Sequence, residues 1–235
     1  MPIIRALQIP EMLPPDRFNR LLESVDPERR ERILRFRRRE DALRCLFGGL
    51  LVRAVLSRTS GVRPRDILLS RDAQGKPNCL FPAHIHFNLS HSGCWVLAAF
   101  DDVPVGVDIE EMKPVNPEVP GLVFSPAEIR TMESLAGNER LSYFYETWTL
   151  KESWLKASGR GISDSLADLT VIPGEKPFRY RLQNSRIMDS AFLSLVPGVD
   201  PDYRAAVCSS RDDSPAAVVR ENAEELAAFF LRDRS

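Results

Sequence analysis

The chain has 235 residues, of which 43% are hydrophobic and 28% are charged, and its formal net charge is −1. This balance is typical of a folded chain with a sizeable core, and it excludes a disordered protein and a general nucleic-acid binder. No apolar run is long enough to span a bilayer, the first residues lack a secretion pattern, and the four cysteines form no CxxC pair. We therefore expect a monomeric, cytoplasmic protein without a nucleic-acid or membrane partner.

The first predicted helices carry many arginines. Asp26 followed by Pro27 is typical of a helix start, and seven arginines lie between positions 29 and 39. They form either a solvated helix face balanced by neighbouring acids or an anion-binding patch. A strong amphipathic helix is predicted over residues 41–57, because apolar side chains recur every three to four positions. Arg44 lies beside that apolar stripe, where it either points into a cavity or covers apolar surface with its stem.

Short strands and turns are predicted next. Residues 67–69 and 95–100 are apolar strand candidates, and residues 85–89 alternate as in a half-buried strand. Gly75-Lys76-Pro77 is typical of a turn with a cation at its tip. The turn between the last two strands is predicted at Ser90-His91-Ser92-Gly93.

All three histidines fall in this part of the chain. His84 and His86 share a strand face, but no cysteine or third histidine completes a tetrahedral zinc set at the usual spacing. We therefore expect no zinc site. His91, in the predicted turn, either meets a phosphate or bonds to nearby backbone.

Residues 105–110 predict a strand with two unlike faces. One face is apolar and consists of Val105, Val107 and Ile109. The other face consists of Gly106, Asp108 and Glu110. Glycine there leaves room for a ligand to approach the backbone, and two nearby carboxylates repel unless a cation lies between them. Mg²⁺ prefers such oxygen ligands together with substrate phosphates. The alternative, which is commoner for an isolated Asp-x-Glu, is a solvated acidic edge strand.

A second long helix is predicted from Asn138, a capping residue, to Gly159, a helix terminator. Its apolar stripe is interrupted by Lys151 and Glu152. Glu152 and Lys156 are one turn apart and share a helix face, as in a surface salt bridge. The interruption of the stripe favours a partly buried catalytic or metal-binding pair instead.

The rest of the chain completes the predicted fold. Residues 112–138 are rich in proline and glycine and are expected to be mobile and exposed, with a capped helix beginning at Ser125. Four short strands and a final helix are predicted at residues 169–172, 178–182, 192–195, 205–208 and 222–231. Each half thus offers a long helix and several strands, which predicts an α+β fold. We divide the chain into residues 1–104 and 105–235.

Five stretches of this sequence resemble the Sfp-type 4′-phosphopantetheinyl transferases. They are residues 36–44, 75–77, 87–92, 106–110 and 148–156. The resemblance implies two similar α/β halves related by a pseudo-twofold, with the active site in the cleft between them. It implies a Mg²⁺-dependent transfer (Mn²⁺ is an alternative) of phosphopantetheine from coenzyme A to a serine of an apo acyl, peptidyl or aryl carrier protein, with release of adenosine 3′,5′-bisphosphate. It thus implies a holo-[acyl-carrier-protein] synthase.

The resemblance also implies roles for individual residues. The metal ligands would be Asp108, Glu110 and Glu152. Lys156 would contact the pyrophosphate and stabilise or protonate the leaving phosphate, and Glu152 is the candidate base for the serine hydroxyl, which gives the catalytic set Asp108, Glu152 and Lys156. His91 and Arg44 would face the 3′-phosphate of coenzyme A. The other coenzyme-binding residues would be Arg29, Arg32, Gly75, Lys76, Pro77, Ser90 and Lys151.

Two other functions are compatible with these residues. One is a Mg²⁺-dependent phosphohydrolase acting on coenzyme A or a related pyrophosphate, which would release adenosine bisphosphate without a carrier protein. The other is a coenzyme A-binding module without catalysis. The full set of acids and cations argues against mere binding, which does not require it.

Overall fold

The N-terminal half is built around a mixed sheet and one central helix. The computed structural model describes residues 1–72, 75–159, 166–175, 178–183, 191–211 and 217–232. In this half the elements are β1 (Ile3–Gln8), α1 (Pro15–Leu22), α2 (Pro27–Arg35), α3 (Arg39–Ser60), the 3-10 helix η1 (Pro64–Asp66), β2 (Leu68–Arg71), β3 (Pro77–Phe81), β4 (His86–Ser92) and β5 (Trp95–Asp101). β2 and β3 form a separate two-stranded ribbon. The predicted helix and strands of this region are all present.

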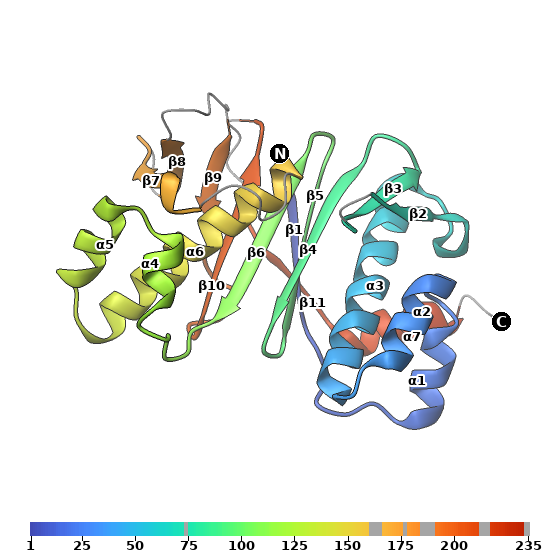
Figure 1. Ribbon diagram of the computed structural model, residues 1–235. Coiled ribbons are helices and arrows are strands. Elements are labelled where there is room, and N and C mark those ends of the chain that lie inside the picture. Colours follow the sequence, from blue (N-terminus) through green and yellow to red (C-terminus); the bar gives the residue numbers. More distant parts are fainter. Residues whose placement is uncertain (73–74, 160–165, 176–177, 184–190, 212–216, 233–235) are drawn as a thin grey trace.

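The C-terminal half contains an antiparallel sheet crossed by a second long helix. Its elements are β6 (Val105–Glu111), α4 (Val119–Val123), α5 (Pro126–Glu133), α6 (Gly137–Ser158), the 3-10 helix η3 (Leu166–Asp168), β7 (Thr170–Pro173), β8 (Arg179–Gln183), β9 (Phe192–Leu195) and β10 (Tyr203–Ser209). The strand order is β6-β10-β9-β8-β7, and α6 lies along β6 and β10 (Figure 1). An α+β fold follows, as expected.

The last segment of the chain returns to the first half. β11 (Val219–Glu221) pairs in parallel with β1, which gives the order β11-β1-β5-β4. α7 (Ala223–Arg232) then packs against α1 and α3 (Figure 1). The expected division at residues 104 and 105 therefore does not hold at the chain end. It failed because a short strand and a terminal helix carry no sequence signal for the sheet that they join.

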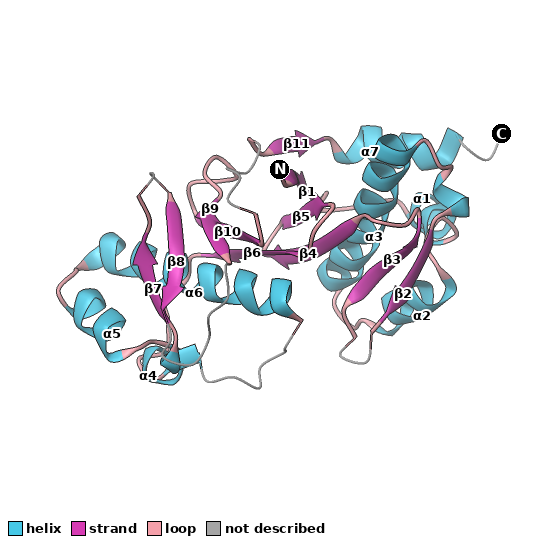
Figure 2. Cartoon of the chain, turned by 90° about the horizontal axis from the view of Figure 1, so that it is seen from above, coloured by secondary structure: helices cyan, strands magenta, loops and turns pink. Residues whose placement is uncertain are grey.

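The two sheets lie side by side and share a core. Figure 2 shows the helices α1, α2, α3 and α7 at one end of the molecule and α4 and α5 at the other. Between them, Ile4, Trp95 and Leu97 of the first sheet join one buried cluster with Val107 and Tyr203 of the second. β4 and β6 lie next to each other at the adjoining edges of the two sheets. The relation of the halves by a twofold axis stays a prediction.

α3 is more deeply buried than its predicted amphipathic pattern indicates. Nearly every side chain from Ala42 to Leu56 is buried, because α2, α7 and the sheet cover it from several sides. The helix runs from Arg39 to Ser60, a few residues beyond the predicted range of 41–57, and its C-cap is Gly61, whose φ of 73° is left-handed. α6 likewise ends at Gly159 with a φ of 68°. Its N-cap is Ala136, without a side-chain bond, rather than the predicted Asn138.

The segment of residues 112–138 is more structured than expected. It contains α4 and α5, and α5 begins with the predicted capping box between Ser125 and Glu128. Phe124 and Met132 are buried against Phe144 of α6 in a small apolar cluster. The prolines and glycines in this segment therefore lie in and between short helices, with a proline in the first turn of both α4 and α5. None of the helices in the described residues combines the length and apolarity needed to cross a membrane.

Gly106 allows α6 to approach β6 closely. A Cβ at this position would lie 2.0 Å from the carbonyl oxygen of Ser153 and 2.4 Å from the backbone nitrogen of Ala157. The glycine therefore makes room for the helix rather than for a ligand, which corrects the expectation from sequence. The acidic face of β6 is consequently held against the polar residues of α6.

Replacing Gly106 tests this close packing. Gly106→Ala should lower the free energy of unfolding by about 3 kcal/mol, because the new methyl group meets backbone atoms that cannot rotate away. Chemical denaturation measures the change. The control is Gly121→Ala in α4, where a Cβ meets no atom within 4 Å. Equal stability of the two variants would mean that α6 can shift away from β6 without cost.

Candidate active site

Asp108 is the centre of a polar cluster where β6, β4 and α6 meet. Its side chain is only 3% exposed. One carboxylate oxygen, Oδ1, accepts hydrogen bonds from Ser90 Oγ at 2.8 Å and from Lys156 Nζ at 2.5 Å. The other oxygen, Oδ2, is buried and has no hydrogen-bond partner among the described residues. An unpaired buried carboxylate oxygen is costly, so this atom is suited to a cation.

Glu110 and Glu152 add negative charge beside Asp108. Burial raises the pKa of both glutamates, and the charge of Asp108 raises both pKa values further. The charge of Lys156 opposes these shifts, and a hydrogen bond of 2.7 Å from Ser92 Oγ also lowers the pKa of Glu110. The structure thus brings together the three acids predicted as metal ligands. A positive charge among them would favour their ionised forms.

Lys156 links the acids to the ribbon of the N-terminal half. Besides its bond to Asp108, Nζ donates to Ser90 Oγ at 3.0 Å. Its carbonyl oxygen accepts a hydrogen bond from Lys76 Nζ, at the β2–β3 turn. Burial lowers the pKa of Lys76. β2 ends at Arg71 and β3 begins at Pro77, and in the connection between them Gly75 has a φ of 82° and donates its N–H to the carbonyl oxygen of Asp72. The predicted Gly-Lys-Pro turn is therefore present, and it reaches the C-terminal end of α6.

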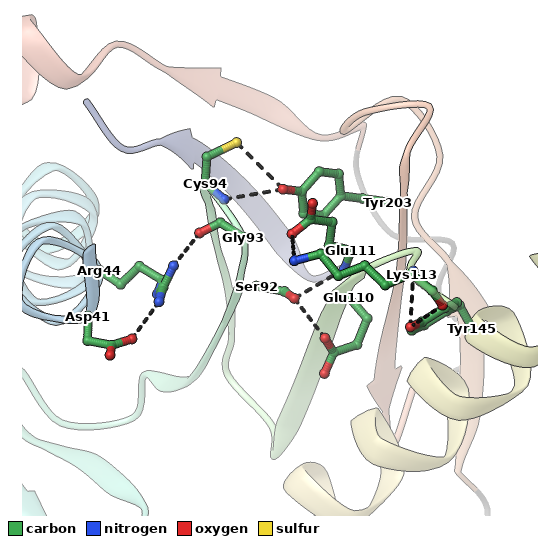
Figure 3. A network of polar contacts seen from close by, with 10 residues as sticks. All are labelled: Asp41, Arg44, Ser92, Gly93, Cys94, Glu110, Glu111, Lys113, Tyr145 and Tyr203. Carbon is green, nitrogen blue, oxygen red and sulfur yellow. Dashed lines mark hydrogen bonds and ion pairs between the residues drawn. The ribbon is translucent and has the colours of Figure 1, made fainter. Parts of the chain in front are cut away.

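A second cationic group lies at the end of the β4–β5 hairpin. Arg44 of α3 donates to the carbonyl oxygen of Gly93 at 2.5 Å and pairs with Asp41 at 2.5 Å (Figure 3). His91 reaches solvent, yet the surrounding protein and the charge of Arg44 lower its pKa. His91 belongs to β4, and the turn is reduced to Gly93 and Cys94, because Ser92 still pairs with Trp95. The predicted turn at residues 90–93 was therefore too long.

In the described ranges, no group of three or more His, Cys, Asp or Glu side chains is arranged so that it could hold a metal ion. Asp108, Glu110 and Glu152 influence one another's charge but do not form such a group. Lys156 holds one oxygen of Asp108 in this structure. A cavity of about 710 Å³ lies elsewhere, near Val25, Arg53 and Phe230, and its lining includes none of the predicted site residues. The chemistry is therefore concentrated at the β4–β6 junction, where acids, lysines and a histidine come from both halves.

Known proteins of one family are similar to this chain over both halves. Residues 104–208 match the model of the 4′-phosphopantetheinyl transferase superfamily, and residues 14–102 match that of the 4′-phosphopantetheinyl transferase N-terminal region. The 4′-phosphopantetheinyl transferase Sfp of Bacillus subtilis is 37% identical over 208 residues, which cover 88% of this chain and 92% of the relative. The chain belongs to the 4′-phosphopantetheinyl transferase family.

Other relatives match over nearly their whole length. The 4′-phosphopantetheinyl transferase ffp of Bacillus subtilis is 36% identical, with 95% of this chain and 99% of the relative covered. The 4′-phosphopantetheinyl transferase gsp of Aneurinibacillus migulanus is 35% identical, with 96% and 93% covered. The match therefore includes both halves and the junction between them.

One residue of the transferase motif faces away from the acids. Lys151 is fully buried, and its Nζ donates to the carbonyl oxygens of Val123 at 2.8 Å and Leu166 at 2.9 Å. It also pairs with Glu128 at 2.6 Å. Burial lowers the pKa of Lys151, and the charge of Glu128 opposes this shift. This placement does not fit a coenzyme-lining role. Lys151 instead fastens α6 to the α4–α5 segment.

The two arginines carried over from the family pattern also differ in their surroundings. Arg29 is only 6% exposed, and its guanidinium donates to the carbonyl oxygen of Cys45 at 3.2 Å. Its stem passes Gly49, where a Cβ would lie 2.6 Å from Cδ of Arg29. Arg29 is therefore part of the core and does not fit a coenzyme contact. Arg32 is exposed and lies over the ring of Phe36 at 6.0 Å.

Sequence reasoning missed the part played by alternate polar residues of β4. Asn88 Oδ1 accepts a hydrogen bond from the backbone N–H of Val107 at 2.9 Å. Ser90 donates to Asp108, and Ser92 donates to Glu110. The alternation of residues 86–90 was visible in the sequence, but the partner strand was not.

The buried ion pair between Lys151 and Glu128 predicts that replacing Lys151 destabilises the fold. Lys151→Met should lower the free energy of unfolding by about 3–5 kcal/mol, because it leaves the Glu128 charge buried without its partner. The matched control is Lys113→Met, which removes an exposed pair with Glu111 at 2.7 Å and should cost at most about 1 kcal/mol. Urea unfolding measures both. A stable Lys151→Met variant that fails to bind coenzyme A would instead support the coenzyme-lining role.

Proposed function

We propose that this protein transfers the 4′-phosphopantetheine group of coenzyme A to a serine hydroxyl of an apo carrier protein and releases adenosine 3′,5′-bisphosphate. The observation that carries the proposal is the meeting of Asp108, Glu110 and Glu152 beside Lys156, in a chain of the 4′-phosphopantetheinyl transferase family. Acyl, peptidyl and aryl carriers all fit this chemistry. With an acyl carrier protein the activity would be that of a holo-[acyl-carrier-protein] synthase.

Asp108, Glu110 and Glu152 would hold Mg²⁺, or Mn²⁺ in its place. Two observations support this assignment: the unpartnered buried Oδ2 of Asp108, and the raised pKa values of both glutamates. All the donors are carboxylate oxygens, which suit a hard divalent cation better than zinc. When bound, the cation would neutralise charge on the pyrophosphate of coenzyme A.

Lys156 and Glu152 would serve the transfer itself. The serine oxygen forms a bond to the β-phosphorus, and the bond from that phosphorus to the bridging oxygen breaks. Lys156 can leave Asp108 and stabilise charge on the departing phosphate. Glu152, one turn before Lys156 on the same helix face, is our candidate to accept the proton of the serine hydroxyl.

Other polar residues would hold the rest of the coenzyme. Arg44 and His91 would face the 3′-phosphate, since they place a guanidinium and an imidazole next to each other at the hairpin end. The remaining contacts are proposed for the ribbon turn and β4, at Gly75, Lys76, Pro77 and Ser90. The exposed arginines of residues 32–39 would suit the acidic surface of a carrier protein.

Removal of single acids tests the proposed transfer. Asp108→Ala and Glu152→Ala should each reduce carrier modification by more than about 100-fold, since even outer-shell partners of a metal are worth 10–100-fold. Mass spectrometry of a panel of apo carriers with coenzyme A and Mg²⁺ measures the modification. The control is Glu139→Ala, an exposed acid in the first turn of α6. Near wild-type transfer by either site variant would reject the metal site. Release of adenosine bisphosphate without a carrier would favour a phosphohydrolase.

The proposed 3′-phosphate contact predicts a change in His91. The pKa of His91 is lowered in the free protein, so a neighbouring phosphate dianion should raise it by favouring the protonated ring. NMR titration of the ring C–H signals measures this pKa with and without coenzyme A. Variants His84→Gln and His86→Gln assign the three signals. Dephospho-coenzyme A, which lacks the 3′-phosphate, is the control. An equal rise with both ligands would place the 3′-phosphate elsewhere.

A further inference from the structure

Side chains of β4 join this strand to β6 by hydrogen bonds with backbone N–H groups and carboxylates of β6. β4 is the last strand of the order β11-β1-β5-β4, and β6 is the first of the order β6-β10-β9-β8-β7. Across this junction Asn88, Ser90 and Ser92, at every second position of β4, bond to groups of β6. Residues two apart on a strand share a face, so all three point toward β6, and two of them, Ser90 and Ser92, reach its carboxylates.

Ser92 makes the most extensive of these connections. Its hydroxyl donates to Oε2 of Glu110 at 2.7 Å and accepts the backbone N–H of Glu111 at 3.1 Å (Figure 3). One hydroxyl therefore fixes both the backbone at the end of β6 and the carboxylate of Glu110. Its hydrogen bond also lowers the pKa of Glu110, against the effects of burial and of Asp108.

The position of Ser92 is itself fixed from both halves. The next residue, Gly93, is held by Arg44 of α3 through its carbonyl oxygen. The backbone N–H of Cys94 donates to the hydroxyl of Tyr203 on β10 at 3.2 Å. A Cβ at Gly93 would lie 2.0 Å from that hydroxyl, so glycine is needed for the approach. Figure 3 shows the hairpin end between these two contacts.

We propose that Ser92 is a positioning residue for the metal site, acting through Glu110 and not through coenzyme A. It holds Oε2 of Glu110 and so fixes the orientation of the carboxylate that the proposed function assigns to the cation. This inference rests on the proposed function, because it assigns Glu110 to a divalent cation. It adds that Glu110, a proposed metal ligand on β6, is oriented by the hydroxyl of Ser92 on β4, which belongs to the other half of the chain.

Metal affinity measured separately from coenzyme affinity tests this role. Ser92→Ala should weaken Mn²⁺ binding to the full chain by about tenfold, the usual loss for an outer-shell partner. Electron paramagnetic resonance of free Mn²⁺ measures binding without coenzyme or carrier. The KM for coenzyme A at saturating Mg²⁺ should not change. Ser92→Thr, which keeps the hydroxyl, should restore Mn²⁺ affinity.

Two controls make the result specific. Ser142→Ala removes a similar hydrogen bond, from Ser142 Oγ to Glu146 Oε1 at 2.8 Å, and should leave Mn²⁺ affinity unchanged. In a Glu110→Gln background, Ser92→Ala should cause no further loss, because its effect passes through that carboxylate. An unchanged Mn²⁺ affinity in Ser92→Ala, or a full further loss in the double variant, would overturn the inference.

The same measurements separate this inference from the proposed function. If the wild-type chain transfers no phosphopantetheine but Ser92→Ala still weakens Mn²⁺ binding through Glu110, the positioning role stands and the transfer proposal falls. If transfer is normal and Ser92→Ala binds Mn²⁺ like the wild type, the positioning role falls and the transfer proposal stands.

Discussion

The junction between β4 and β6 is the constraint on which the site depends. At a sheet edge, backbone groups without partners are costly, and here polar side chains reach across instead. Asn88 and Ser92 accept backbone N–H groups of β6, while Ser90 and Ser92 bind its carboxylates. The acids of one half are therefore held in place by the other half, and the site exists only where both meet.

The packing of α6 on β6 is the second constraint. Gly106 lets the helix approach so closely that Glu152 and Lys156 lie beside Asp108. Adjacent helix residues point in different directions, since each step turns the helix by about 100°. Lys151 consequently points into the α4–α5 side of the helix, where it pairs with Glu128. Neighbours in a family motif can thus lie in different surroundings, Glu152 beside the acids of β6 and Lys151 in a buried pair with Glu128.

In the arginine-rich segment, too, residues that match the family pattern lie in different surroundings. Arg29 is directed inward because Gly49 leaves space for its stem and because Cys45 offers a carbonyl oxygen. Arg32, one turn later, stays exposed. Both residues are arginines at positions that the family resemblance assigns to the coenzyme, and they differ in burial. A cation in a matching position therefore indicates a ligand contact only when its side chain is free to reach one.

The sequence by itself determined the long helices and most strands, because apolar period, capping residues and glycines act over short distances. It also indicated the family, because the residues that resemble it stand in short, ordered motifs, and it singled out Asp108, Glu110 and Glu152 as candidate metal ligands. Only the tertiary structure decided which polar side chains meet: that Ser92 holds Glu110, that Lys151 is buried, and that β11 and α7 return to the first half. Such contacts join residues far apart along the chain, and their partners are set by how the sheets and helices pack, which no local pattern records.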